Sequence, residues 1–440
     1  MKVLKFGGTS VGSIQNIKKV KEIINDGDKK IVVLSAMSGT TNSLVAISES
    51  IRNKEIENAK IQINKLYKKY ENVVNDLFEI SETKQLVANY IDSVFEGLLK
   101  AVTEKYSDVL YAKIVAQGEL LSTFIFTKYL TASGIHARLL PALDFMRIDK
   151  LNDPDEFYIQ QNLQRIINET LPADIYITQG FICLDAFGNL ANLQRGGSDY
   201  TATIIGAVVN AFEVEIWTDI DGMHNNDPRF VNNTHAISNL SYDEAAELAY
   251  FGAKILHPQT VMPARKASIP VRLKNTMEPD CHGTLISVNT SNVGIKAIAA
   301  KDDITAIKIK SARMLLAHGF LKKVFEIFEK YEAPIDMITT SEIAVSLTID
   351  NATFLNEIID ELVKFSTVEI DSEQTIICLV GHHIVRHHET YRLFKVLQDL
   401  PVRMISYGGS NNNISLLVNA SDKVTALKLL NNYVFETVEV

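Results

Sequence analysis

The chain has 440 residues, of which 46% are hydrophobic and 22% are charged, so it is long enough for several globular domains with sizeable cores. Its 44 basic and 53 acidic residues give a net charge of −9. Proteins that bind the phosphate backbone of nucleic acids need a broad basic surface, which this composition does not provide. We therefore expect no nucleic-acid partner.

The cysteines and the N-terminus predict a cytoplasmic protein. Cys183, Cys281 and Cys378 lie far apart, which fits neither a disulfide framework nor a pair of metal-binding cysteines. The chain reaches Gly7 and Gly8 before a signal-type apolar stretch forms. No apolar run approaches the roughly 20 residues that span a bilayer, so we expect no membrane partner.

The first part of the chain alternates strand and helix patterns. Residues 2–6 read as a strand, and apolar residues at helical spacing over 14–24 predict a helix. This alternation predicts a three-layer αβα domain with a mainly parallel central sheet over residues 1–290. Residues 55–105 show long helical patterns without a strand and predict a helical insertion. Further buried strands are expected at residues 31–35, 175–178 and 214–218.

The C-terminal part contains a weak internal repeat. It follows a loop rich in Pro, Gly and Asn at 278–294. Residues 324–328 align with 393–397, and residues 334–339 align with 401–406. The repeat predicts two small α+β domains, each with the element order βαββαβ. We expect them at residues 295–372 and 373–440. The strand expected at 295–300 can belong to the second copy, which would make the two domains nested.

Residues 5–13, Lys-Phe-Gly-Gly-Thr-Ser-Val-Gly-Ser, predict a glycine-rich turn between a strand and a helix. Glycines let backbone N–H groups approach phosphate oxygens, and Lys5 supplies a positive charge. Because the lysine precedes the glycines, the motif is neither a P-loop nor a dinucleotide-binding fingerprint. Gly7 and Gly8 are therefore candidate phosphate-binding residues, although a tight capped turn would use the same glycines.

A second glycine-rich turn at 194–202 leads into a helix of small residues. Arg195 can grip a carboxylate through two parallel hydrogen bonds, and Asp199 can orient a neighbouring lysine. The turn therefore indicates an anionic substrate, and an N-capping turn with a solvated arginine is the alternative.

Residues 217–229 begin at the end of a predicted strand. Ligands of open parallel sheets bind beyond the carboxyl ends of the strands. This places Thr218 and Asp219 for contacts to a nucleotide, and Arg229 for contacts to a phosphate. The Asp-Gly and Asp-Pro pairs of this segment are also ordinary turn formers.

Two single charged residues are further candidates. Lys254, in Phe-Gly-Ala-Lys-Ile-Leu-His-Pro at 251–258, can reach a transferring phosphoryl group, or can interact with a helix C-terminus. Glu119 can hold a substrate ammonium group, or can be an ordinary surface residue. The histidines of residues 382–388 lack the cysteine or carboxylate that would complete a ligand set, so we expect no metal-binding residues.

Together these motifs resemble the aspartate kinase branch of the amino-acid kinase family along essentially the whole chain. As a set they are highly specific, since glutamate and acetylglutamate kinases share the fold without them. The repeated C-terminal units resemble paired ACT domains. The motifs are KFGGTSVGS at 5–13, RGGSDYTA at 195–202, WTDIDG at 217–222, NDPR at 226–229 and FGAKILHP at 251–258.

The resemblance implies transfer of the γ-phosphoryl group of ATP to the side-chain carboxylate of L-aspartate, with Mg²⁺ carried on the nucleotide. The product would be 4-phospho-L-aspartate, the first step towards lysine, threonine and methionine. The implied catalytic residues are Lys5 and Lys254, which stabilise charge, Gly7 and Gly8, which donate backbone hydrogen bonds, and Asp199, which organises the lysines.

The resemblance also implies contacts to both substrates. Arg195 would hold the α-carboxylate of aspartate and Glu119 its ammonium, with Thr41 and Ser198 nearby. Relatives often carry a tyrosine where this chain has His224, which leaves the adenine-side contacts open. The residues expected at the nucleotide are Thr218, Asp219, His224, Arg229 and Lys254.

A difference between the two repeat copies suggests an effector. The first copy has Asp336 where the second has Arg403, and a carboxylate favours a basic ligand such as L-lysine. The stretch also resembles the lysine-sensitive branch, so we expect feedback inhibition by L-lysine and a homodimer, or a tetramer, held through the ACT domains. The alternative is a purely structural ACT pair. The expected effector site comprises His318, Gly319, Phe320, Leu321, Asp336, Thr340, Ser341 and Glu342.

Two other functions remain open at this point. An amino-acid sensor without activity would have no need to retain Lys5, Asp199 and Lys254 together. A kinase for another acidic substrate, such as glutamate, can be distinguished only by substrate competition.

Overall fold

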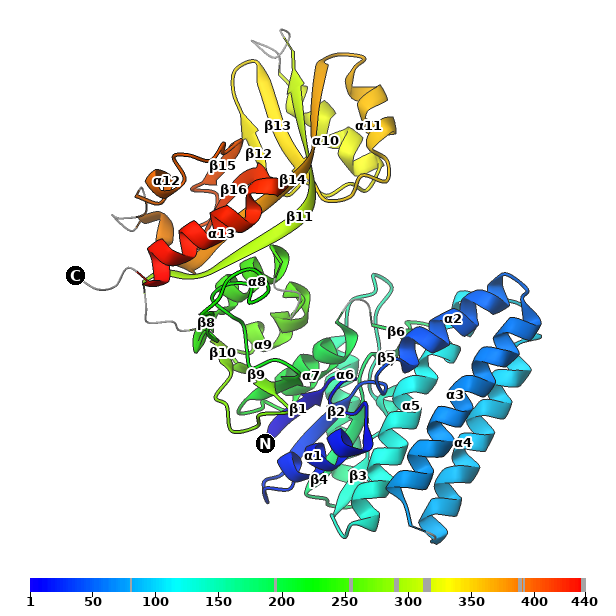
Figure 1. Ribbon diagram of the computed structural model, residues 1–440. Helices are drawn as coiled ribbons and strands as arrows, with labels where there is room; N and C mark the ends of the chain where they lie inside the picture. Colours follow the sequence, from blue (N-terminus) through cyan, green and yellow to red (C-terminus); the bar gives the residue numbers. More distant parts are fainter. Residues whose placement is uncertain are drawn as a thin grey trace. The chain divides into compact units, whose positions relative to one another are not determined.

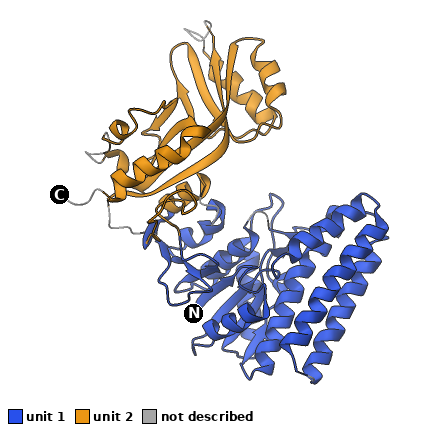
Figure 2. Cartoon of the chain, viewed as in Figure 1, with its two compact units in different colours: residues 1–222, 238–242, 256–288 blue, residues 223–237, 243–255, 289–440 orange. Residues whose placement is uncertain are grey.

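The computed structural model describes residues 1–79, 81–193, 196–252, 256–288, 293–311, 318–386, 390 and 392–436. The chain forms two compact units, which Figure 2 shows in different colours. The first unit comprises Met1–Gly222, Ser238–Tyr242 and Leu256–Val288. The second comprises Met223–Ile237, Asp243–Ile255 and Asn289–Val440.

A mainly parallel sheet forms the centre of the first unit. Its strand order is β3-β4-β2-β1-β7-β9-β10-β8, and β10 pairs antiparallel with β9. A separate hairpin pairs β5 (Ile182–Leu184) with β6 (Leu190–Asn192). The strands of the main sheet are β1 (Lys2–Phe6), β2 (Lys30–Leu34), β3 (Ala137–Leu139), β4 (Ile175–Gln179), β7 (Val214–Thr218), β8 (Asn239–Ser241), β9 (Val271–Asn275) and β10 (Thr284–Ser287).

Helices cover both faces of this sheet. Successive side chains of a strand point to opposite faces, so Leu4 and Phe6 pack into the core shared with α1 and α5, whereas Lys5 points towards α7. The predicted insertion is the helical hairpin of α3 and α4, which lies beside α5 (Figure 1). The helices of this unit are α1 (Ile14–Ile24), α2 (Thr40–Arg52), α3 (Ile56–Leu77), α4 (Glu82–Ala101), α5 (Asp108–Ala132), η1 (Ala142–Asp144), α6 (Glu156–Glu169), α7 (Gly197–Val208), η2 (Pro258–Val261) and α9 (Met262–Lys266).

Helix α5 differs from the expectation that no segment is long and apolar enough to cross a membrane. Among the described residues it is the one helix that meets both conditions. However, 67% of its most apolar window is buried inside the first unit. A core helix has this property, because it is apolar on every side.

An antiparallel sheet forms the centre of the second unit, with the strand order β12-β13-β11-β14-β16-β15. Its long central strands, β11 (Gly294–Lys310) and β14 (Thr367–His382), pair with each other along their length. The outer strands are β12 (Ile338–Thr340), β13 (Ala344–Ile349), β15 (Met404–Tyr407) and β16 (Asn413–Asn419). The helices are α8 (Tyr242–Tyr250), α10 (Phe320–Lys330), α11 (Leu355–Leu362), η3 (Ile384–Arg386), α12 (Arg392–Val396), η4 (Ala420–Asp422), α13 (Lys423–Asn431) and η5 (Asn432–Glu436).

Each half of this sheet has its own apolar core. Ile307 and Leu347 pack with α10 and α11, whereas Ile377 and Leu416 pack with α13. The early part of β11, up to Lys301, pairs with the late part of β14, from Ile376 onwards. The fold class is as predicted, a mainly parallel α/β unit together with α+β repeats, while the predicted domain limits remain predictions.

Candidate active site

A cavity of about 730 Å³ opens in the first unit beside the carboxyl ends of β1, β2 and β7. Parallel strands bring their carboxyl ends to one edge of a sheet, and open α/β sheets bind ligands at that edge. The cavity therefore lies where the strand-end motifs predicted a site. The predicted site residues that line it are Lys5, Gly7, Gly8, Thr41, Glu119, Ser198, Asp199 and Thr218.

The glycine-rich turn after β1 approaches the following loop very closely. A Cβ atom on Gly8 would lie 2.9 Å from the carbonyl oxygen of Ala36, a separation that real side chains do not tolerate. The amide of Ser38 donates to the carbonyl of Gly8 at 3.0 Å, and the amide of Gly7 donates to the carbonyl of Trp217 at 3.1 Å. A phosphate contact by the Gly7 amide would therefore compete with a hydrogen bond of the fold.

Lys5 and Asp199 form an ion pair in the cavity wall. Lys5 Nζ lies 2.7 Å from Asp199 Oδ1, and the two side chains are 12% and 14% exposed. Lys5 is fixed on the central strand β1, and Asp199 lies in the first turn of α7, where the helix dipole favours a carboxylate. The carboxylate thus orients the ammonium group, which can stabilise negative charge on a phosphoryl group.

Glu119 lies on the core helix α5 and is only 3% exposed, so it is not the ordinary surface residue that the sequence left as an alternative. Its Oε1 accepts a hydrogen bond from the amide of Ala36 at 3.1 Å, while Oε2 is buried without a hydrogen-bond partner among the described residues. Burial raises the pKa of Glu119 to about 7, although the positive charge of Lys5 opposes the shift. Such a carboxylate can pair with a cationic group that enters the cavity.

The hydroxyl residues of the predicted site lie around the same space. Thr41 belongs to the first turn of α2, and Ser198 is a 9% exposed residue of α7. Thr218 ends β7, and its hydroxyl donates to Asp219 Oδ1 at 3.0 Å. Asp219 itself is exposed and is not among the described residues that line the cavity.

Besides Asp219, four predicted residues are not brought to the cavity by the described structure. Arg195 and Lys254 lie outside the described residues, as do His387 and His388 of the discounted histidine group. His224 and Arg229 belong to the second unit. There His224 Nδ1 lies 3.1 Å from Thr234 Oγ1, and the exposed guanidinium of Arg229 pairs with Asp227 at 2.6 Å.

Sequence reasoning missed the loop of residues 35–39, which follows β2 and lines the cavity along its whole length. Its sequence, Ser-Ala-Met-Ser-Gly, follows a fully buried strand, and Gly39 adopts a φ of 75° just before α2. A small-residue loop that ends in glycine after a central strand is the signal that could have identified it. Other lining residues without a sequence signal are Asn42, Tyr111, Phe181 and Asn192.

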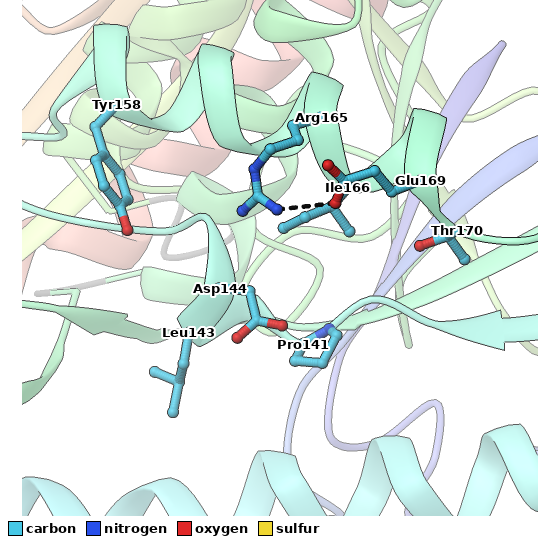
Figure 3. A pocket seen from close by; sticks show the side chains of 8 residues that line it. All are labelled: Pro141, Leu143, Asp144, Tyr158, Arg165, Ile166, Glu169 and Thr170. Atoms are coloured by element: carbon cyan, nitrogen blue, oxygen red, sulfur yellow. Dashed lines mark hydrogen bonds and ion pairs between the residues drawn. The ribbon is translucent and has the colours of Figure 1, made fainter.

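A second hollow of about 570 Å³ in the first unit lies between η1 and α6 (Figure 3). Its clearest polar feature is the ion pair of Arg165 with Glu169 at 2.9 Å, whose side chains are 52% and 62% exposed. Exposed pairs of this kind are solvated and carry little energy. None of the predicted site residues lines this hollow, so the chemistry is expected in the larger cavity.

In the second unit, the predicted effector carboxylate Asp336 already has a cation beside it. Its side chain is 0% exposed, and Oδ1 lies 2.5 Å from Lys301 Nζ and 2.8 Å from the hydroxyl of Tyr250. Lys301 also pairs with Asp350 at 2.9 Å. Burial raises the pKa of Asp336, although Lys301 and Tyr250 oppose the shift, and Oδ2 has no hydrogen-bond partner among the described residues.

The other predicted effector residues lie on two segments of the first repeat copy. Gly319 has a φ of 88° and precedes α10, whose first residue, Phe320, is buried in the core. An apolar core position leaves the Phe320 ring little surface for a ligand. The remaining predicted residues are exposed, namely His318, Leu321, Thr340, Ser341 and Glu342.

Known protein families match both parts of the chain. The amino acid kinase family matches residues 1–275, and an ACT domain family matches residues 377–433. The first match covers the cavity, the helical hairpin and every strand of the main sheet except β10. The second covers the late part of β14 together with β15, β16 and α13.

Full-length relatives have related sequences. The chain is 33% identical to lysine-sensitive aspartokinase 3 of Escherichia coli, over 99% of both chains. It is 35% identical to the chloroplastic aspartokinase 1 of Arabidopsis thaliana, over 99% of this chain and 80% of that protein.

Solved structures are similar over the same length. Escherichia coli aspartokinase III in complex with aspartate and ADP (R-state) has a TM-score of 0.83 at 31% identity and covers 99% of this chain and 100% of that one. The same protein in complex with lysine and aspartate (T-state) has a TM-score of 0.80 at 31% identity and 99% coverage of both chains.

Proposed function

The chain belongs to the amino acid kinase family as an aspartokinase, and on that premise we propose that it converts L-aspartate and ATP into 4-phospho-L-aspartate and ADP. An oxygen of the aspartate side-chain carboxylate attacks the γ-phosphorus of ATP, and the bond from that phosphorus to the β–γ bridging oxygen breaks. This reaction would be the first step towards lysine, threonine and methionine. No covalent intermediate with the protein is required, because phosphoryl transfer depends mainly on positioning and charge stabilisation.

The observation that carries this proposal is the meeting of cationic, anionic and glycine-turn groups in one cavity. The Lys5–Asp199 pair and the buried carboxylate of Glu119 both line it. Lys5 is suited to stabilise charge on the transferring phosphoryl group, and Glu119 is suited to the substrate ammonium. Thr41 and Ser198 would lie close to the aspartate, and Thr218 close to the nucleotide.

Several assignments in this proposal rest on the family resemblance. Arg195 would hold the α-carboxylate of aspartate, and Lys254 would stabilise the phosphoryl group together with Lys5. The proposed nucleotide contacts also include Asp219, His224 and Arg229. Magnesium would arrive with ATP, whose phosphates supply oxygen ligands for this hard cation. The proposed residue limits are 1–290 for the kinase domain and 295–372 and 373–440 for the two ACT domains, which are nested if strand 295–300 joins the second.

We further propose feedback inhibition by L-lysine through the first ACT copy, in a homodimer or tetramer that works in the cytoplasm. Escherichia coli aspartokinase III, at 31% identity, forms a complex with lysine and aspartate. Among the described residues, Oδ2 of Asp336 has no hydrogen-bond partner and is available to a ligand ammonium, whereas Oδ1 is engaged by Lys301 and Tyr250. An effector at Asp336 therefore has to share the carboxylate with Lys301 or displace it.

The test is ATP-dependent acyl-phosphate formation, trapped with hydroxylamine. L-Aspartate should give the hydroxamate and L-glutamate should not, and Lys5→Ala should reduce turnover by a factor on the order of a hundred while ATP binding survives. Equal product from glutamate, or near-normal turnover of the Lys5 variant, would contradict the proposal.

The effector is tested in the same assay by adding lysine or threonine. Lysine should inhibit and threonine should not, and Asp336→Ala should abolish the effect of lysine. Unchanged inhibition of that variant by lysine would show that the effector binds elsewhere.

A further inference from the structure

A lysine of the helical insertion reaches the loop that lines the cavity. Lys69 lies on α3, and its Nζ donates to the carbonyl oxygen of Ser38 at 2.5 Å and to Thr40 Oγ1 at 3.2 Å. The neighbouring Tyr70, which is fully buried, places its hydroxyl 3.1 Å from the same Thr40 Oγ1. Two successive side chains of the insertion thus hold the end of loop 35–39 and the start of α2.

The charge of Lys69 has no counter-ion in the described structure. None of the described carboxylates lies within 4.0 Å of its Nζ, and its two hydrogen bonds among the described residues go to the loop and to α2. Burial lowers the pKa of Lys69. Partial burial of a cation without a carboxylate partner costs free energy. A helix face that only has to be solvated does not need a lysine in this position.

The loop that Lys69 holds is attached to the predicted catalytic groups from two other sides. The Ser38 amide donates to the carbonyl of Gly8 in the glycine turn, at 3.0 Å. The Ala36 amide donates to Glu119 at 3.1 Å, and Thr41, two residues beyond the loop, lines the cavity. A shift of the Ser38 carbonyl would therefore move the groups that face the aspartate.

We propose that Lys69 is a positioning residue of the aspartate site, which holds the Ser38 carbonyl so that loop 35–39 presents Thr41 and Ala36 to the cavity. The inference rests on the proposed function, because it assigns the loop to aspartate rather than to ATP. It also gives the insertion a role in substrate binding. Lys69 itself does not touch the reacting atoms.

Steady-state kinetics of the full chain tests this role through the two Michaelis constants. Lys69→Met should raise the KM for aspartate about tenfold, as expected for the loss of a charge-assisted hydrogen bond, while the KM for ATP stays unchanged. Lys69→Arg should restore most of the aspartate affinity. Lys68→Met, which removes the same charge from the exposed neighbouring position, is the matched control and should behave as the unmodified chain.

Amide hydrogen exchange provides a second measurement that does not depend on activity. In Lys69→Met, the amides of Ser38 and Thr40 should exchange faster than in Lys68→Met, whereas α4 should exchange at the same rate. Equal kinetics and equal exchange in the two variants would overturn the proposal, as would a parallel increase of both KM values. If the unmodified chain formed no aspartyl hydroxamate, the proposed function would fail, and the exchange result would still report on the loop contact.

Discussion

Each unit of the molecule buries a carboxylate that is predicted to bind an ammonium group, and the two carboxylates have different partners within the chain. Glu119 in the first unit accepts a hydrogen bond only from a backbone amide among the described residues and faces the cavity. Asp336 in the second unit is paired with the ammonium of Lys301 and with the Tyr250 hydroxyl. Among the described residues, an ammonium group therefore contacts Asp336 directly, whereas none contacts Glu119.

The difference separates a ligand site from a structural ion pair that a ligand could exploit. Burial raises the pKa of both carboxylates, but the cation beside Asp336 opposes the shift directly. A substrate ammonium would give Glu119 the direct cationic partner that the described residues do not provide. An effector ammonium at Asp336 has to compete with the ammonium of Lys301, which lowers the net binding free energy of the effector.

The largest expected effect comes from removing the internal cation. Lys301→Met should lower the free energy of unfolding of the second unit by about 3–5 kcal/mol, because Asp336 is left buried without its partner. Urea unfolding of the full chain, with exchange of the β13 amides as a local probe, measures this. Lys308→Met, on the same strand but in a more exposed pair with Glu369, is the control and should cost much less. Equal losses of unfolding free energy in the two variants would show that the buried Lys301–Asp336 pair contributes no more than an exposed pair.

The corresponding change in the first unit should affect binding rather than stability. Glu119→Gln removes the charge that we expect to hold the substrate ammonium, so the KM for aspartate should rise by about tenfold or more while the KM for ATP changes little. Glu104→Gln, at an exposed position, serves as the control. An unchanged KM for aspartate would remove Glu119 from the substrate site.

The raised pKa of Glu119, about 7, predicts a pH dependence of the same interaction. Only the ionised carboxylate pairs with an ammonium, so the KM for aspartate should rise by about tenfold per pH unit below that value and level off above it. Because the folded pKa lies above the ordinary value, Glu119 also makes the ligand-free fold less stable as the pH rises towards 7. Both trends should vanish in Glu119→Gln, and their persistence would assign them to another group.

The smallest effect is expected in the second repeat copy. Its aligned residue Arg403 pairs with Asp371 at 2.5 Å, but the side chains are 30% and 44% exposed. Arg403→Met should therefore lower the free energy of unfolding by less than about 1 kcal/mol, in contrast to Lys301→Met. A comparable loss in both variants would show that exposure does not distinguish the two copies.

The fold class and part of the candidate site could be predicted because their signals are local. Lys5 and the glycine turn occupy one continuous strand–turn–helix motif. Asp199 lies in the first turn of a helix that directly follows a second glycine-rich turn. The contacts of Lys69 and Lys301 could not be predicted in this way. Each lysine lies at an ordinary polar position of its own element and meets its partner only through tertiary packing.

The same limit applies to Glu119 and to α5. A glutamate within an apolar helix is compatible with exposure or burial, and only the surrounding helices decide between them. The length and apolar composition of α5 predict a buried helix, but they do not indicate which elements cover it. In this chain the covering elements include the α3–α4 hairpin, which lies outside the alternating pattern of strands and helices.

The two long strands β11 and β14 have a consequence for how the second unit unfolds. Each strand runs through both apolar cores, each half of one pairs with a half of the other, and the register of the pairing shifts around Ile304, where the two halves meet. Residues 295–301 of β11, which come before the rest of the first copy in sequence, pair with residues 376–381 of the second copy, so these hydrogen bonds have to break before the first copy can detach. A chain that ends after residue 372 should therefore keep the core around Ile307 and Leu347, whose members all lie between residues 307 and 368, and lose the core around Ile377 and Leu416.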